Sequence, residues 1–191
     1  MFKFEKLVFG DLGWGDEFLF ATLMTITVSI LSMGLGLCLA IITVWAKLIS
    51  SRLTRFIANL YTTVVRGVPE LLVIYLIFFG GNSVVMGIAK LFGYDGYIEL
   101  NALTIGTIAI AFISATYSSE VIRAAYLSVN KGQVEAAKAL GLKKFHIFLK
   151  VMGPQIIRHA LPGIGNVWQI TLKDTSLISV TGLVEIMRQS R

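Results

Sequence analysis

Long uncharged apolar stretches dominate the pattern of hydrophobic and polar positions along the chain. Residues 18–46 carry no charge, and this stretch exceeds the roughly 20 residues that an α-helix needs to cross a bilayer. Similar stretches predict spans at about 57–80, 100–122 and 160–184. Helices are favoured over strands because each backbone amide in lipid must be hydrogen-bonded within its own segment. The pattern predicts an all-α integral membrane protein, a transmembrane bundle with four spans in a single domain, 1–191.

A polar segment interrupts the second predicted span, and two adjacent charges lie inside the fourth. The interruption, Arg66-Gly67-Val68-Pro69-Glu70, contains a proline that removes one helical hydrogen bond. Arg66 and Glu70 are four positions apart and would face one another on a continuous helix. Both a hinge and a simple kink are consistent with this segment. Lys173 and Asp174 must face other helices or a hydrated cavity, because ionisable groups are costly in hydrocarbon.

Composition and charge agree with a membrane protein and orient its helices. Hydrophobic residues make up 55% of the 191-residue chain and charged residues 15%, against about 25% charged in a typical soluble domain. Lys and Arg gather in the connections at 47–55 and 120–158, which the positive-inside rule places in the cytoplasm. The net charge of +6 therefore reflects topology, whereas a nucleic-acid surface would require a basic face on a soluble domain. Four spans would leave Arg188 and Arg191 outside, which suggests that a fifth helix is missing from this chain.

The third connection, about residues 130–154, predicts a cytoplasmic helix, turn and helix. Helix formers fill 134–139, Gly141 interrupts them, and 143–152 resumes the helical pattern. The sequence GQVEAAKALG, which ends at Gly141, resembles the EAA loop of binding-protein-dependent ABC importer permeases. The match includes Glu-Ala-Ala, the glycine at its spacing, an aliphatic residue and Pro154. Gly153 stands where leucine is usual in that loop, and this departure weakens the second short helix.

Further motifs extend the resemblance over nearly the whole chain and are similar to the polar amino acid branch, which transports histidine, lysine, arginine, glutamine or opines. Residues 66–71 are similar to its Arg-Gly-x-Pro-x-Leu signature. Residues 117–120 with Arg123 are similar to the helix that leads into the loop, and 172–177 to a late-helix motif. The resemblance implies the type I ABC importer permease fold, which usually has five transmembrane helices.

The same resemblance implies a permease subunit in the bacterial cytoplasmic (inner) membrane. It would pair with a second permease subunit, in a homodimer or heterodimer, around a path for a polar amino acid or an amino-acid-like solute. An external solute-binding protein would deliver the solute, and separate ABC ATPase subunits would bind ATP and Mg²⁺. The chain has no Gly-x-x-x-x-Gly-Lys-[Ser/Thr] motif. We therefore expect that it is not an enzyme and binds no cofactor itself.

Three sets of candidate residues follow. In the coupling set, small side chains let a helix press into a groove of the ATPase, and glycine permits a tight reversal; the members are Gly132, Gln133, Glu135, Ala136, Ala137, Gly141 and Pro154. Candidates for the translocation path or its gate are Arg66, Glu70, Lys173, Asp174, Thr175 and Ser176. For the last four, a buried ion pair with hydrogen-bonded packing is an equal alternative. Glu120 and Arg123 are expected to pair and fix the base of the loop.

Other interpretations of the chain have less support. A lone Cys38 and two histidines predict no metal site. A permease of the same fold for another small solute, such as methionine or an oxyanion, is disfavoured by the polar amino acid signatures. An ion-driven secondary transporter would show internal repeats, and a membrane enzyme would show a convergent catalytic set. Neither feature is visible in the sequence.

Overall fold

The computed structural model describes residues 14–48, 51–91, 93 and 101–181, and helices make up nearly all of this part of the chain, with no strand in it. Three of these helices are long and apolar enough to cross a membrane: α1 (Gly15–Leu48), α3 (Glu70–Leu91) and α4 (Ala102–Leu127). The expected all-α membrane architecture is therefore present. The fourth predicted span, 160–184, begins inside a later helix and ends outside the described residues, so it stays a prediction.

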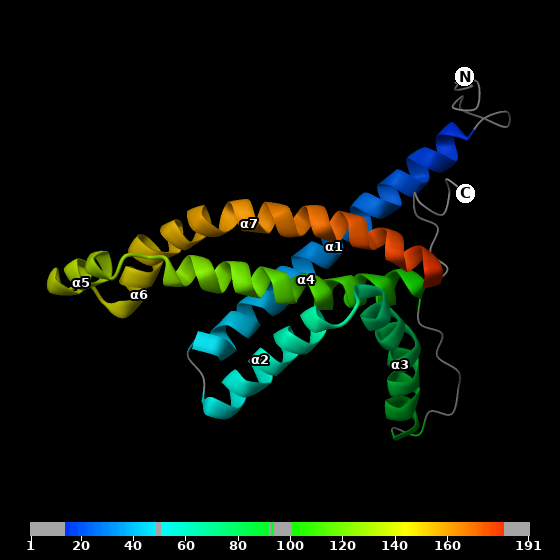
Figure 1. Cartoon of the computed structure of the whole chain (residues 1–191), viewed down its shortest axis with the longest axis horizontal. Helices are drawn as coiled ribbons and strands as arrows, with labels where there is room; N and C mark the ends of the chain where they lie inside the picture. Colours follow the sequence, from blue (N-terminus) through cyan, green and yellow to red (C-terminus); the bar gives the residue numbers. More distant parts are fainter. Residues whose placement is uncertain (1–13, 49–50, 92, 94–100, 182–191) are drawn as a thin grey trace.

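Helices α1 and α4 cross closely and form the centre of the molecule (Figure 1). Small side chains make this approach possible. A Cβ on Gly36 of α1 would collide with Ser114 Oγ of α4, and Ser32 Oγ donates a hydrogen bond of 3.1 Å to the carbonyl oxygen of Thr107. The crossing holds the two helices in a fixed register, which determines what the side chains near their ends can reach.

The polar interruption divides the predicted second span into two helices, α2 (Arg52–Gly67) and α3, which diverge as the arms of a V (Figure 1). Val68 is extended, with φ −106° and ψ 142°, as expected for a residue that precedes a proline. Pro69 then begins the next turn, and its carbonyl oxygen accepts a 2.9 Å hydrogen bond from the Leu72 amide. The interruption expected within the span at 57–80 is thus a full break between two differently directed helices.

The predicted loop contains α5 (Lys131–Ala139), a turn, and α6 (Lys144–Ile147). Helix α6 continues through the π-helical segment η2 (Phe148–Met152) into α7 (Gly153–Asp174), and the 3₁₀ segment η3 (Thr175–Thr181) follows. The second helix of the loop is therefore the beginning of a long helix. Gly153 lies at the π-helical junction, where a Cβ would be 3.1 Å from the carbonyl oxygen of Phe148. A side chain at this position would therefore require a small shift of the π-helical backbone.

Helix α7 lies along α4 and returns the chain from the loop to the V-shaped break (Figure 1). Gly163 of α7 packs on Val121 of α4, and Gly106 of α4 packs on Ile178 of η3. An added Cβ at either glycine would come within 2.6 Å of those side chains. These contacts hold α7 and η3 against α4, and η3 also contacts α3, near the candidate site.

Candidate functional site

A buried ion-pair network ties α1, α2 and α4 together at the end of the molecule that leads to the loop. Lys47, at the end of α1, is only 7% exposed. Its Nζ donates to Glu120 Oε1 of α4 at 2.5 Å and to Thr62 Oγ1 of α2 at 2.7 Å. The other carboxylate oxygen of Glu120 accepts from Arg123 at 2.9 Å. Both oxygens of Glu120 thus have a cationic partner, and the buried lysine has a counter-charge.

A second polar cluster lies at the V-shaped break and has no such compensation. The Tyr117 hydroxyl of α4 donates to Glu70 Oε1 at 3.0 Å, and the Arg66 guanidinium lies over the ring of the same tyrosine, 5.4 Å from its centroid. The buried carboxyl group of Asp174, at the end of α7, lies close enough to that of Glu70 for the two acidic groups to influence one another. Two acidic groups therefore face each other, while Arg66 has no ion pair within the described residues.

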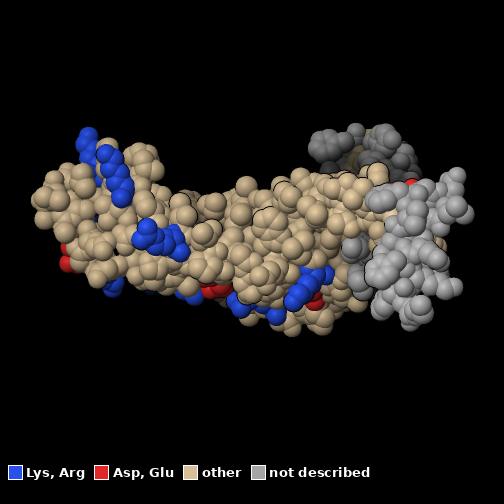
Figure 2. All heavy atoms as spheres, turned by 90° about the horizontal axis from the view of Figure 1, so that it is seen from above, with Lys and Arg blue, Asp and Glu red and all other residues tan. Residues whose placement is uncertain are grey.

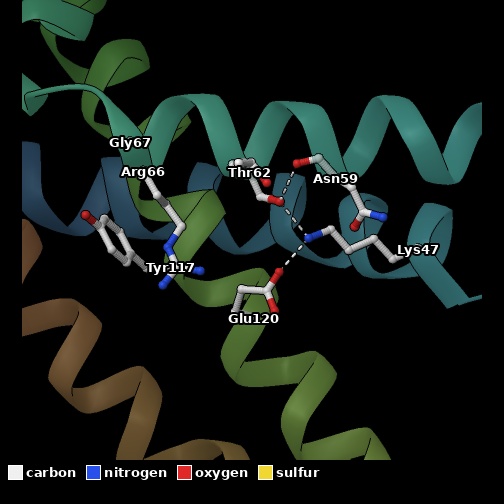
Figure 3. Close-up of a pocket in the computed structure, with 8 residues that line it drawn as sticks. Lys47, Asn59, Thr62, Arg66, Gly67, Tyr117 and Glu120 are labelled. Atoms are coloured by element: carbon white, nitrogen blue, oxygen red, sulfur yellow. Dashed lines mark hydrogen bonds and ion pairs between the residues drawn. The ribbon is translucent and has the colours of Figure 1, made fainter.

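A pocket of about 690 Å³ lies between α1, α2 and α4 and connects the two sets of residues (Figure 3). Figure 3 shows Arg66 directed from α2 toward α4, between Tyr117 and Glu120, with Lys47 on the far side of Glu120. Such a volume lies in the range of about 300–1,000 Å³ that is typical of small-molecule sites. The walls are mostly polar and are formed by Lys47, Asn59, Thr62, Thr63, Arg66, Gly67, Tyr117 and Glu120.

The loop forms an exposed tip at the opposite end of the molecule from α3 (Figure 1). Asn130 Oδ1 caps α5 by accepting from the Gly132 amide at 2.8 Å. The helix ends at Ala139, and Gly141, just after the C-cap, has a φ of +75°, a left-handed conformation that glycine adopts without strain. A 2.6 Å hydrogen bond between the side chains of Gln133 and Gln155 joins α5 to α7. The tip is therefore a defined structure whose orientation is linked to the long helix behind it.

The outward surface of the tip combines basic and apolar side chains. Glu135 and Ala136 are exposed, whereas Ala137 is buried against the body of the loop. Leu140 is 81% exposed and Phe145 69% exposed. Figure 2 shows Lys and Arg side chains gathered at this end of the molecule. A surface of this kind can bind a protein partner through both apolar contacts and charge.

The family model for the binding-protein-dependent transport system inner membrane component matches residues 33–191. The chain belongs to this family. It is a permease subunit of an ABC importer, and the predicted fold class and family are confirmed.

Similar permeases cover nearly the whole chain. A nopaline transport system permease from Agrobacterium fabrum is 51% identical over 95% of this chain and 78% of its own length. An octopine transport system permease from Rhizobium meliloti is 45% identical over 98% and 79%, respectively. A histidine/lysine/arginine/ornithine transport system permease from Escherichia coli is 36% identical over 94% and 78%. The crystal structure of an amino acid ABC transporter with histidines superposes with a TM-score of 0.77 at 30% identity, covering 93% of this chain and 77% of the other.

Within this permease, the predicted path residues separate into different environments. Asp174 is 6% and Thr175 2% exposed, and both belong to the interior beside the break. Lys173 is exposed and forms no ion pair with Asp174 in the described part of the chain. The hydroxyls of Thr175 and Ser176 donate to the carbonyl oxygens of Leu172 and Lys173. The alternative of a buried Lys173–Asp174 pair is therefore not found.

The other predicted pairs also have definite outcomes. Glu120 and Arg123 pair as expected. Arg66 and Glu70 form no ion pair in the described structure, because the break at Val68 and Pro69 puts them on different helices and Tyr117 lies between them. Sequence reasoning missed the buried role of Lys47, which it treated as a loop charge, and the shared role of Tyr117. Among the described residues no group of His, Cys, Asp and Glu side chains is arranged to hold a metal ion.

Proposed function

We propose that this permease forms part of the translocation path for an amino acid or opine that carries a cationic group. Names of similar permeases include nopaline, octopine, histidine, lysine, arginine and ornithine transport systems. The complex would contain a second permease subunit, an external solute-binding protein and ABC ATPase subunits in a bacterial inner membrane. ATP and Mg²⁺ would bind to the ATPase, and this chain would hold no cofactor.

The observation that carries the proposed solute class is the acidic pair of Glu70 and Asp174 at the break. Two carboxyl groups that face one another repel when both are ionised, and an acidic group at membrane depth is costly without a partner. A cationic group between them would remove both penalties. In secondary transporters, broken helices surround a solute site at the membrane midplane, and the break between α2 and α3 offers a comparable position in this chain. These arguments support a position on the solute path for Glu70, Asp174, Arg66 and the neighbouring Thr175 and Ser176.

The loop supports the second half of the proposal, which is coupling to the ATPase. The exposed carboxylate of Glu135 can form charge-assisted contacts with a basic partner, and the small Ala136 lets the partner approach α5. Gly141 follows the C-cap of α5 in the left-handed conformation, with no heavy atom within 4 Å of a Cβ built on it. A side chain added there would meet no neighbour in this chain, but its backbone would be strained at this positive φ, so the control for a substitution must carry the same strain.

The coupling role is tested by Gly141→Asp and Glu135→Lys, with Gly93→Asp as the matched control. Gly93 has a φ of +79° and the same open space around its Cβ as Gly141, but it follows α3 at the opposite end. We expect both loop variants to insert normally and to lose solute uptake and co-purification of the ATPase. Gly93→Asp should retain both. Full uptake by either loop variant would contradict the coupling role.

A further inference from the structure

The walls of the pocket between α1, α2 and α4 carry two cationic side chains and one acidic side chain. Its charged walls are Lys47, Arg66 and Glu120. Glu120 does not neutralise Arg66, because Lys47 and Arg123 already occupy its two oxygens. The Arg66 guanidinium lies 5.4 Å from the centroid of the Tyr117 ring and forms no ion pair with another described residue, so its N–H donors are available to a ligand. The local charge therefore favours an anionic occupant.

Uncharged hydrogen-bonding groups complete this environment. Asn59 and Thr63 line the pocket from the same helix as Arg66. Their side chains are exposed and have no hydrogen bond to another described residue. A planar carboxylate can accept two parallel hydrogen bonds from a guanidinium and others from an amide and a hydroxyl. The pocket thus offers the donor set that a carboxylate requires.

We propose that this pocket is a carboxylate subsite, in which Arg66 is the principal donor and Asn59 and Thr63 are secondary donors. The inference rests on the proposed function, because it assigns the second end of the solute to this pocket. Tyr117 separates the two ends: its hydroxyl binds Glu70 and its ring supports Arg66. A solute with a cationic group and a carboxylate can then span the tyrosine, with the cation at Glu70 and Asp174 and the carboxylate at Arg66.

The experiment measures binding of radiolabelled arginine by the assembled permease–ATPase complex in lipid nanodiscs, with arginine amide as competitor. The amide keeps the guanidinium but lacks the carboxylate. We expect wild type to prefer arginine by about tenfold or more, as for loss of a charge-assisted hydrogen bond. Arg66→Gln should lower arginine affinity by a similar factor and remove the preference over the amide. Arg55→Gln, which removes an exposed cation from the same helix, should change neither value.

Two further measurements cover the remaining outcomes. If Arg66→Gln lowers the melting temperature of the complex, Arg66→Lys replaces it, and an intermediate preference is expected because the charge remains without the planar donor set. Sulfate serves as a second competitor, which tests whether an inorganic anion occupies the pocket in place of the solute carboxylate. The subsite is contradicted if wild type binds arginine and its amide equally, or if Arg66→Gln changes sulfate sensitivity alone. Absence of binding and uptake for arginine, octopine and nopaline in wild type would overturn the proposed solute class itself.

Discussion

Two charged clusters meet on neighbouring turns of α4 and differ in how their charges are balanced. Around Glu120, each carboxylate oxygen has a cationic partner, and the buried Lys47 has two acceptors. Around Tyr117, two carboxyl groups face one another and Arg66 lies over an aromatic ring. The first cluster is complete within this chain, whereas the second is not.

This difference separates a structural function from a binding function. A satisfied network fixes the relative positions of its helices, because moving one helix would leave a buried charge without a partner. An unsatisfied cluster gains stability when a ligand supplies the missing charges. The contrast assigns the Lys47 network to holding α1, α2 and α4, and the Tyr117 cluster to the solute. Substitutions in the two clusters should therefore affect different measurements.

The largest effect on stability is expected for Glu120→Gln. This change leaves the buried Lys47 without a counter-charge, and loss of one partner of a buried pair costs about 3 kcal/mol or more. Thermal denaturation of the purified permease complex measures the loss. The double variant Lys47→Met/Glu120→Gln should recover most of it, because no buried charge remains. Equal stability of Glu120→Gln and wild type would show that this network is not what holds the helices.

Asp174→Asn should have the opposite pattern, with no loss of stability and a large loss of transport. Replacing one of two facing carboxyl groups removes repulsion within the chain, so membrane abundance should be equal to or higher than in wild type. Uptake of a cationic solute should fall by about tenfold, the usual cost of a charged hydrogen bond. Asp16→Asn, at an exposed position in the first turn of α1, is the control. Normal uptake with Asp174→Asn would remove the acidic pair from the solute path.

The sequence predicted the architecture well because long apolar runs and a spaced motif are local features. It did not predict the environments of Lys173 and Asp174 individually, although adjacent residues on a helix point in different directions. Lys47 follows the first apolar run, and in the sequence it counted only as one of the positive charges that place the first connection in the cytoplasm. Its burial depends on Thr62 and Glu120, which are 15 and 73 positions away.

The break in the second span also depends on contacts that a local sequence pattern does not predict. Pro69 indicated a perturbed helix, and the sequence favoured a simple kink slightly over a hinge. The direction of α3 after the break depends on packing against α4 and η3. Tyr117 belonged to a recognised motif, yet its partner Glu70 lies 47 positions earlier. Contacts between distant segments therefore determine which polar residues form a site, and local patterns do not contain this information.

The smallest effect is expected for Tyr117→Phe, which separates the hydroxyl of this residue from its ring. The ring that supports Arg66 remains, while the 3.0 Å hydrogen bond to Glu70 is lost. The hydroxyl contacts Glu70 and not the solute in this proposal, so affinity for a cationic solute should change only a few-fold, although the hydrogen bond itself is one to a charged group and contributes about 1.5 kcal/mol or more.

Tyr117→Leu is the matched comparison for this prediction, because it removes the ring as well. If the ring positions Arg66, the leucine variant should lose the preference for arginine over arginine amide, whereas the phenylalanine variant should keep it. Binding competition on the assembled complex gives both values. Equal behaviour of the two variants would mean that the ring does not position Arg66, and the division of the solute between two ends of Tyr117 would then be wrong.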